Sequence, residues 1–299
     1  LITATAGTDN TKIGDGAGAA IASGGNYNVA IGKDAGASLT TGDSNVAVGV
    51  DALNGTTTSN HNVAIGKGSL ASNVTGEKNI AIGSASLDAN TTGDQNVAVG
   101  NSALGSMNIT DGSASYNTAV GADAGKNITT GTSNTLIGGL AGDALTVAYY
   151  NIAVGEGALS ADVQGSRSVA VGWNALNDQS FSSTTISYNT AVGHEAGKSS
   201  TTAQYNTLVG YEAGKEILAG GTNTLMGVLA GGALTSGNGN ICIGIEAGLN
   251  NVAVSDGTNN IFIGYQARAN ATNASQQIVL GRQVTCTGNS NFTFGDGGT

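Results

Sequence analysis

The stretch NVAIGKDAG at residues 28–36 sets the pattern for the whole chain. It recurs as NVAVGVDAL at 45–53, NVAIGKGSL at 62–70 and NIAIGSASL at 79–87, so successive copies begin seventeen positions apart. Each copy begins with an anchor asparagine, continues with a β-branched, a small and a second β-branched residue, and reaches a glycine four places after the anchor. A fixed period of this kind is typical of repeat proteins in which each repeat is one structural unit.

Sixteen anchors follow one another along the sequence, and their spacing departs from this period at four places, where it is 21, 21, 20 and 14. Asparagine occupies most anchors: Asn28, Asn45, Asn62, Asn79, Asn96, Asn117, Asn134, Asn151, Asn189, Asn206, Asn223, Asn240, Asn260 and Asn291. Ser168 and Gln277 occupy the other two. Glycine follows four places later in every repeat, beginning with Gly32, Gly49, Gly66, Gly83 and Gly100. A weaker unit at Asn10–Gly14 precedes this array.

Each five-residue block has the pattern of a short β-strand and a turn. Its β-branched residues lie on one face of the strand and the small residue between them on the other. Glycine then turns the chain, because it accepts backbone angles that other residues avoid. A repeat of this length suffices for two or three strands joined by tight corners. We therefore predict an all-β fold, a parallel β-solenoid with one repeat per turn.

The anchor asparagines have two interpretations, both structural. Stacked turns would align them in a continuous ladder of hydrogen-bonded amides along the axis. Alternatively, each asparagine is a turn residue that tolerates left-handed backbone angles.

The thin coil has a consequence for assembly. Each turn offers about three sizeable apolar side chains, and burying one contributes roughly 1.5–3 kcal/mol, whereas ordering each residue costs ~1–2 kcal/mol. A single coil would be marginally stable. We therefore expect a parallel homotrimer in which each coil buries its small-residue face against two copies.

The composition argues against several functions. Ten Lys and Arg against twenty Asp and Glu give a net charge of −10, which opposes nucleic-acid binding because phosphate neutralisation needs clustered cations. No run approaches the ~18 apolar residues of a membrane span, so we expect no membrane insertion by this segment. Cys242 and Cys286 lie in different repeats, and we expect two free thiols.

No residues converge on a catalytic, metal or cofactor site. Acidic residues recur two places after the glycine but are whole turns apart, so we expect a solvated face. His61 and His194 occupy different places in the repeat, and no serine lies in a nucleophile elbow. We expect no enzyme activity and no cofactor. A polysaccharide-degrading β-helix enzyme and an ice-binding protein are the less favoured alternatives.

Aromatic residues and two insertions are the candidates for surface contact. Tyr116, Tyr188 and Tyr205 precede anchors, and Trp173 follows a repeat glycine. They either contact cell-surface glycans weakly at many points or cover corners and neighbouring chains. Four-residue insertions near Met107–Ser115 and Ser180–Ser187 recur at the same place in two longer repeats, each made of four short ones. They are either binding loops or a record of duplication.

The repeats also carry a resemblance. NVAIG with an alanine-containing turn resembles the head repeat of trimeric autotransporter adhesins, which implies a left-handed parallel β-roll trimer. The longer form with NTAVG is similar to shaft repeats of bacteriophage tail fibres, and IVLGRQVTCTGNSNFTFGDG at 278–297 resembles the stretch before the intramolecular chaperone of such fibres.

The resemblance implies a non-enzymatic fibre shaft in a virion tail that displays a receptor-binding tip for host attachment. The alternative is the head or stalk of a bacterial surface adhesin that binds host matrix or cells. Expected partners are two further copies, other tail or surface components, and cell-surface glycans or receptor proteins. We expect residues 1–27 to be a cap or connection, 28–276 the repeat array, and 277–299 terminal repeats that lead to a further C-terminal region.

Overall fold

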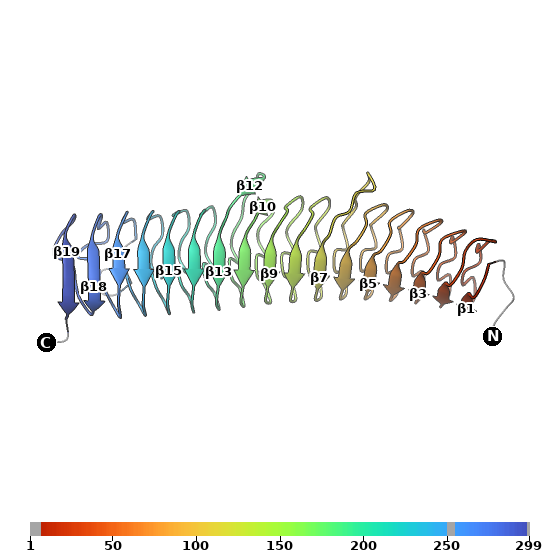
Figure 1. Cartoon of the computed structure of the whole chain (residues 1–299), viewed down its shortest axis with the longest axis horizontal. Helices are drawn as coiled ribbons and strands as arrows, with labels where there is room; N and C mark the ends of the chain where they lie inside the picture. The colour runs from red at the N-terminus through yellow and green to blue at the C-terminus, as the bar shows by residue number, and fades with distance from the viewer. Residues whose placement is uncertain (1–6, 250–254, 298–299) are drawn as a thin grey trace. The chain divides into compact units, whose positions relative to one another are not determined.

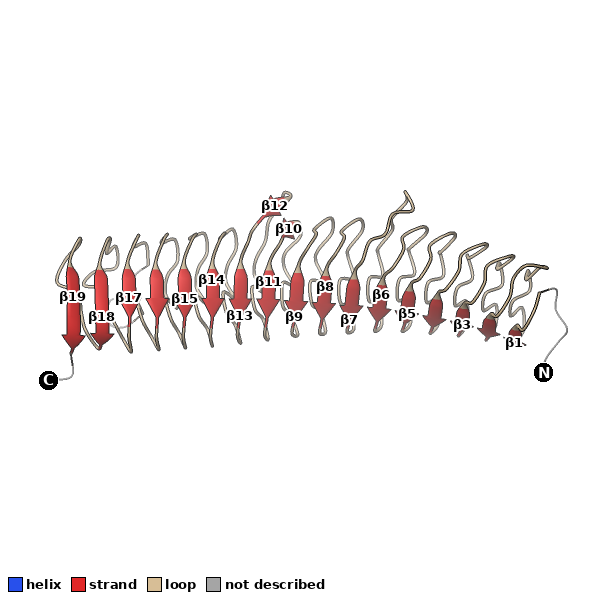
Figure 2. Cartoon of the chain, in the orientation of Figure 1, coloured by secondary structure: helices blue, strands red, loops and turns tan. Residues whose placement is uncertain are grey.

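The computed structural model describes residues 7–249 and 255–297. Within these residues the regular structure consists of β-strands and contains no helix, as Figure 2 shows. The chain divides into an N-terminal unit that ends at Tyr150 and a C-terminal unit that begins at Asn151. Both units have the same construction, one short strand per repeat with loops between (Figure 1).

The N-terminal unit contains eight described strands, seven of which begin directly after an anchor of the array. They are β1 (Thr11–Ile13), β2 (Val29–Ile31), β3 (Val46–Val48), β4 (Val63–Ile65), β5 (Ile80–Ile82), β6 (Val97–Val99), β7 (Thr118–Val120) and β8 (Thr135–Ile137). The first strand, β1, belongs to the weaker unit at Asn10–Gly14 and pairs with β2 like any other neighbour.

The C-terminal unit contains the remaining strands. They are β9 (Ile152–Val154), β10 (Gly165–Ser166), β11 (Val169–Val171), β12 (Thr185–Ile186), β13 (Thr190–Val192), β14 (Thr207–Val209), β15 (Thr224–Met226), β16 (Ile241–Ile243), β17 (Ile261–Ile263), β18 (Ile278–Arg282) and β19 (Phe292–Asp296). Strands β10 and β12 form a separate two-stranded pair outside the main ladder.

Within each unit, successive repeats pair in parallel and in register. Val46, Ala47 and Val48 of β3 lie opposite the same positions of β4, and β4 stands in the same relation to β5. In the C-terminal unit, β13 to β17 repeat this register. The prediction of an all-β parallel β-solenoid with one repeat per turn is therefore confirmed.

Two kinds of apolar side chain fill the interior of the coil in repeats such as those of β4 and β5. The middle residue of the strand is fully buried, as at Ala64 and Ala81, and so is the leucine eight places after the anchor, as at Leu70 and Leu87. Small residues opposite larger ones let the two layers approach closely. The β-branched strand residues on either side are intermediate or exposed.

This arrangement corrects one expectation about the faces of the strand. The small-residue face does not lie free to pack against other copies, because the alanines are already buried within their own coil. The outward face instead carries the β-branched residues. Alternation alone defines two faces without telling which one is inside.

The repeat glycine is required by both backbone angle and space. Gly49 has a φ of +132°, and a Cβ atom added there would lie 2.6 Å from the carbonyl oxygen of Gly66 in the next repeat. The five named glycines have the same left-handed backbone: Gly32, Gly49, Gly66, Gly83 and Gly100. No other residue satisfies both conditions.

Many of the remaining corners use single non-glycine residues with positive φ, which sequence reasoning did not anticipate. Leu70 has a φ of +52°, Asp123 of +57° and Tyr116 of +51°. Each such residue costs about 1 kcal/mol or more and persists only where its surroundings fix it. Here backbone hydrogen bonds between stacked repeats supply that constraint, as between the Asp123 N–H and the Asn101 carbonyl at 2.9 Å.

The two insertions extend the loops of their repeats. Ala114 in the first forms a parallel bridge with Asp94, and in the second β12 pairs with β10. In Figure 1 the loop that carries β12 extends past the edge of its neighbours. The expected division at residues 27 and 276 stays a prediction. Residues 1–6, 250–254 and 298–299, which belong to the three expected segments, lie outside the described residues.

Candidate functional site

The anchor asparagines form a buried ladder within each unit. The backbone N–H of Asn45 donates to Oδ1 of Asn28 at 2.9 Å, and the N–H of Asn62 donates to Oδ1 of Asn45 at 3.0 Å. Nδ2 of Asn45 also donates to the carbonyl of Ser59 at 2.9 Å. The bond from backbone to preceding amide recurs at Asn79, Asn96, Asn117, Asn134, Asn206, Asn223, Asn240 and Asn260.

The ends of the ladder differ from the predicted set. Asn10 extends it at the start, because its Oδ1 accepts the N–H of Asn28 at 2.8 Å. Gln277 continues it near the other end by donating its N–H to Asn260 Oδ1 at 3.0 Å. Asn291 is exposed and lies outside the buried ladder.

The ladder changes where serine replaces asparagine. The Ser168 N–H donates to Oδ1 of Asn151 at 2.9 Å, as usual. Its short hydroxyl, however, contacts the Ser187 hydroxyl and accepts from Nε2 of Gln179 at 2.9 Å. Oε1 of Gln179 in turn accepts from Nδ2 of Asn189 at 2.9 Å. Residues beside and within the second insertion thus take the place of the missing amide.

The aromatic residues predicted at the surface are exposed: Tyr116, Trp173, Tyr188 and Tyr205. In the C-terminal unit they form two stacks. The Tyr188 and Tyr205 rings lie 5.6 Å apart between centroids with an interplanar angle of 28°. His194 lies between Trp173, at 4.7 Å, and Tyr211, at 5.2 Å.

Cations cover further ring surface in both stacks. The Arg167 guanidinium lies 5.7 Å from the Tyr188 ring centroid and donates to its hydroxyl at 2.7 Å, and Lys198 Nζ lies 5.8 Å from the Trp173 centroid. The stacking and the cations occupy one or both faces of Tyr188, Trp173 and His194, which leaves less ring surface for stacking on a sugar.

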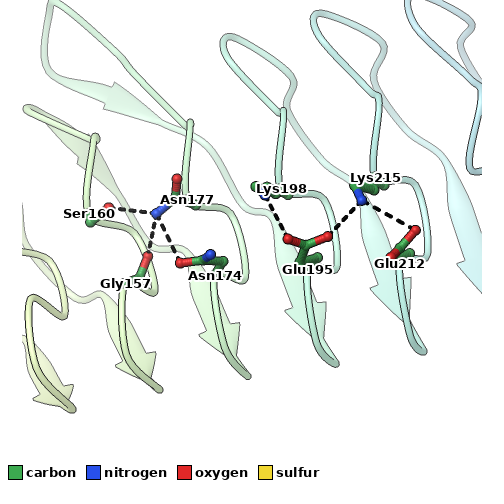
Figure 3. Close-up of polar contacts among 8 residues, drawn as sticks. All are labelled: Gly157, Ser160, Asn174, Asn177, Glu195, Lys198, Glu212 and Lys215. Atoms are coloured by element: carbon green, nitrogen blue, oxygen red, sulfur yellow. Dashed lines mark hydrogen bonds and ion pairs between the residues drawn. The ribbon is translucent and has the colours of Figure 1, made fainter.

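Two of the acidic residues that lie two places after the glycine, Glu195 and Glu212, make ion pairs with a lysine three residues later (Figure 3). Glu195 is 6% exposed and accepts from Nζ of Lys198 at 2.6 Å and from Nζ of Lys215 at 2.7 Å. Lys215 also lies 3.4 Å from Glu212. Hydrogen bonds from both ammonium groups lower the pKa of Glu195 to about 2. The expected solvated acidic face is therefore wrong for Glu195.

Sequence reasoning missed this ion-paired row although its signal was present. The acid and lysine are part of the strings DAGK at 123–126 and EAGK at 195–198 and 212–215. A neighbouring repeat of the same unit uses an amide instead: Asn177 donates to Ser160 Oγ at 2.7 Å and to the Gly157 carbonyl at 2.9 Å (Figure 3). The row links adjacent turns through side chains.

The described residues bear on the cysteines, on metal binding and on membrane-spanning helices. Cys242 and Cys286 are free and buried, as predicted, and burial raises the pKa of the Cys242 thiol to about 12. Within residues 7–249 and 255–297, no cluster of three or more His, Cys, Asp or Glu side chains is arranged to hold a metal ion. No helix suited to crossing a membrane occurs in that part of the chain.

No protein-family model matches the sequence, and no curated protein matches it significantly.

Proposed function

We propose that this chain is a shaft segment of a homotrimeric attachment fibre, a non-enzymatic scaffold that displays a binding tip. A bacteriophage tail fibre in the virion is the favoured setting. The proposal depends on one observation, the apolar outward face of the strands.

That face consists of the first and third residues of each strand. In the N-terminal unit Ile65 and Ile82 are each 37% exposed, and in the C-terminal unit Ile243 and Ile263 are 37% and 38% exposed. Their neighbours in the register are mostly Val, Ile or Thr. Monomeric soluble proteins rarely expose contiguous apolar patches of more than a few hundred Å², so this face is suited to contact with a partner.

A second copy of the chain is the partner that best fits the face. Apolar side chains recur once per turn, every ~4.8 Å along the stack, and another copy lying parallel and in register repeats at the same interval. Closed cyclic symmetry is the usual arrangement of identical chains. The resemblance of the repeats to those of trimeric fibres favours three copies, with the left-handed coil that it implies.

The head or stalk of a bacterial trimeric surface adhesin is the second candidate. One observation favours it: the anchors before β18 and β19, Gln277 and Asn291, are closer together than any other successive pair, and the head repeat of that family is likewise shorter than the usual repeat of this chain. In that case the chain would lie at the bacterial surface. Flanking sequence that encodes a tail-attachment region or a membrane anchor would distinguish the two settings.

Mass in solution tests the assembly. Analytical ultracentrifugation at micromolar concentration should give three times the chain mass of 29.1 kDa. Ile82→Asp should weaken association at least tenfold, because it places a charge on the outward face. Val74→Asp is the matched control, since Val74 is 41% exposed but lies outside the strands. A folded, stable monomer of the unmodified chain would contradict the proposal.

A further inference from the structure

A gap in one column of side chains forms an open notch, lined by small and polar residues, in the N-terminal unit. Asp88, Gly105 and Lys126 each lie nine places after an anchor, in three successive repeats. Backbone hydrogen bonds hold these repeats stacked on one another. They run from the Ala89 N–H to the Gly105 carbonyl at 3.3 Å and from the Ser106 N–H to the Lys126 carbonyl at 2.9 Å. Gly105 contributes no side chain, and a cavity of about 710 Å³ lies there.

The two ends of the notch carry opposite charges. At ~4.8 Å per turn, Asp88 and Lys126 belong to turns about 10 Å apart. Asp88 is partly buried and takes part in no ion pair among residues 7–249 and 255–297. Burial raises the pKa of its carboxyl group. Lys126 is half-exposed and lies 3.1 Å from Asp123.

The first insertion supplies a wall of the notch. Asn108 lines it, and its Oδ1 accepts a hydrogen bond from the Thr91 hydroxyl at 2.7 Å. Its Nδ2 donates no hydrogen bond to any described residue. A smaller cavity of about 290 Å³, lined in part by Ile109 and Asp111, lies on the next part of the same insertion. The insertion thus adjoins two hollows.

We propose that this notch binds a neutral, hydroxyl-rich saccharide unit. The Asp88 carboxylate can accept from two neighbouring hydroxyls, and Asn108 and Lys126 can donate to ring or hydroxyl oxygens. The lining contains no aromatic ring, so hydrogen bonds rather than stacking carry recognition. The net charge of −10 disfavours a polyanionic ligand.

The site goes beyond a shaft function, because a shaft need not bind anything along its length. The notch is open, so the affinity of one site is weak. A polysaccharide with repeating units could engage several copies of the notch in an assembly, and linked sites can raise the overall affinity 10²–10⁴-fold, as an order-of-magnitude estimate.

Filling the gap provides the sharpest test. Gly105 lacks a left-handed backbone angle, and a Cβ there would lie 3.2 Å from the Ser102 carbonyl oxygen. Asp88 and Lys126 occupy the same place in the neighbouring repeats, so Gly105→Lys should fold. Gly232→Lys is the matched control. Gly232 also lies nine places after an anchor, in the C-terminal unit, and a Cβ there would likewise lie 3.2 Å from its nearest contact, a carbonyl oxygen.

The probe is an array of immobilised neutral oligosaccharides of glucose, galactose, mannose and N-acetylhexosamines, with sialylated and sulfated glycans as the acidic arm. We expect binding to the neutral arm that Gly105→Lys and Asp88→Asn each weaken at least tenfold, while Gly232→Lys leaves it unchanged. No binding, binding confined to acidic glycans, or binding that survives both notch variants would overturn the assignment. Circular dichroism checks folding, and solution mass reports separately on the fibre proposal.

Discussion

At the residue scale, one short amide performs several tasks at each anchor. Oδ1 of Asn62 accepts the N–H of Asn79 at 2.9 Å, and its Nδ2 donates to the Gly76 carbonyl at 2.9 Å. All of these groups are cut off from water, where an unpaired polar group is expensive. Asparagine combines a donor and an acceptor at the right reach, which explains its recurrence better than turn preference alone.

Replacing one anchor should therefore destabilise the chain measurably. Asn62→Ala leaves the Asn79 N–H without a partner, whereas the Gly76 carbonyl keeps its hydrogen bond from Nδ2 of Asn73 at 2.9 Å. A buried unsatisfied group costs about 1–3 kcal/mol. We expect the free energy of unfolding, measured by urea denaturation, to fall by about 1–3 kcal/mol on this basis. Asn101→Ala, at an exposed asparagine, is the control and should stay within about 0.5 kcal/mol. Equal effects of the two variants would refute a structural ladder.

The ion pairs of Glu195 predict a dependence of stability on pH. Its pKa is lowered from 4.5 to about 2, first by the hydrogen bond from Lys198 and then by that from Lys215. A lowered carboxyl pKa contributes stability that is complete above pH 4.5 and is lost as the pH falls toward 2. Hydrogen bonds to charged groups contribute about 1.5–3 kcal/mol, so Glu195→Gln should lower the melting temperature at pH 7.

The difference in melting temperature between Glu195→Gln and the unmodified chain should become smaller as the pH falls. Melting curves between pH 7 and pH 2 would measure the difference, with Glu216→Gln as the control because Glu216 is exposed. A difference that stays constant down to pH 2 would show that the Glu195 charge does not stabilise the fold.

At the scale of elements, the sequence predicts the strands and their parallel register but not the direction of their faces. Alternation in NVAIG places Val63 and Ile65 opposite Ala64 without telling which side is inside. The deciding residue is Leu70, which enters the same coil with a left-handed backbone angle that propensities do not anticipate. A narrow coil accommodates leucine opposite alanine, and the β-branched residues face outward.

The candidate sites were predictable to different degrees. Exposure of Tyr188 and Tyr205 follows from their place before an anchor, but their mutual stacking depends on side-chain geometry that spacing does not define. The ion pairs of Glu195 were detectable in the EAGK string. The notch at Gly105 was not, because a missing side chain becomes a feature only once the register places Asp88 and Lys126 on either side of it.

At the scale of the whole molecule, the proposed trimer requires the edges of the outward faces of neighbouring copies to lie next to each other. In a closed three-fold arrangement, the edge where the chain enters the strands of one copy adjoins the edge where it leaves them in the next. The C-terminal unit carries bulky side chains at both edges in successive repeats. The pairs are Arg167 with Trp173, Tyr188 with His194, and Tyr205 with Tyr211.

We therefore predict that these edge rows meet between copies, and cysteine cross-linking tests this. Tyr188→Cys and His194→Cys, in a chain with Cys242→Ala and Cys286→Ala, should give a disulfide-linked trimer on oxidation. Within one chain the two positions are separated by roughly 15 Å or more of extended backbone, whereas a disulfide needs ~4.4–6.8 Å between α-carbons. Any bond must therefore join different chains.

The pattern of cross-linked products distinguishes the possible arrangements. Tyr188→Cys with Ser199→Cys is the control, because Ser199 lies ten places after its anchor, beyond the turn that ends the strand, and should not meet Tyr188 of another copy. A trimeric mass without cross-linking of Tyr188→Cys to His194→Cys would mean that three copies associate through another surface. Cross-linking that stops at dimers would mean that the outward faces of two copies pack directly on each other. A two-fold arrangement brings the same two edges together but closes after two chains.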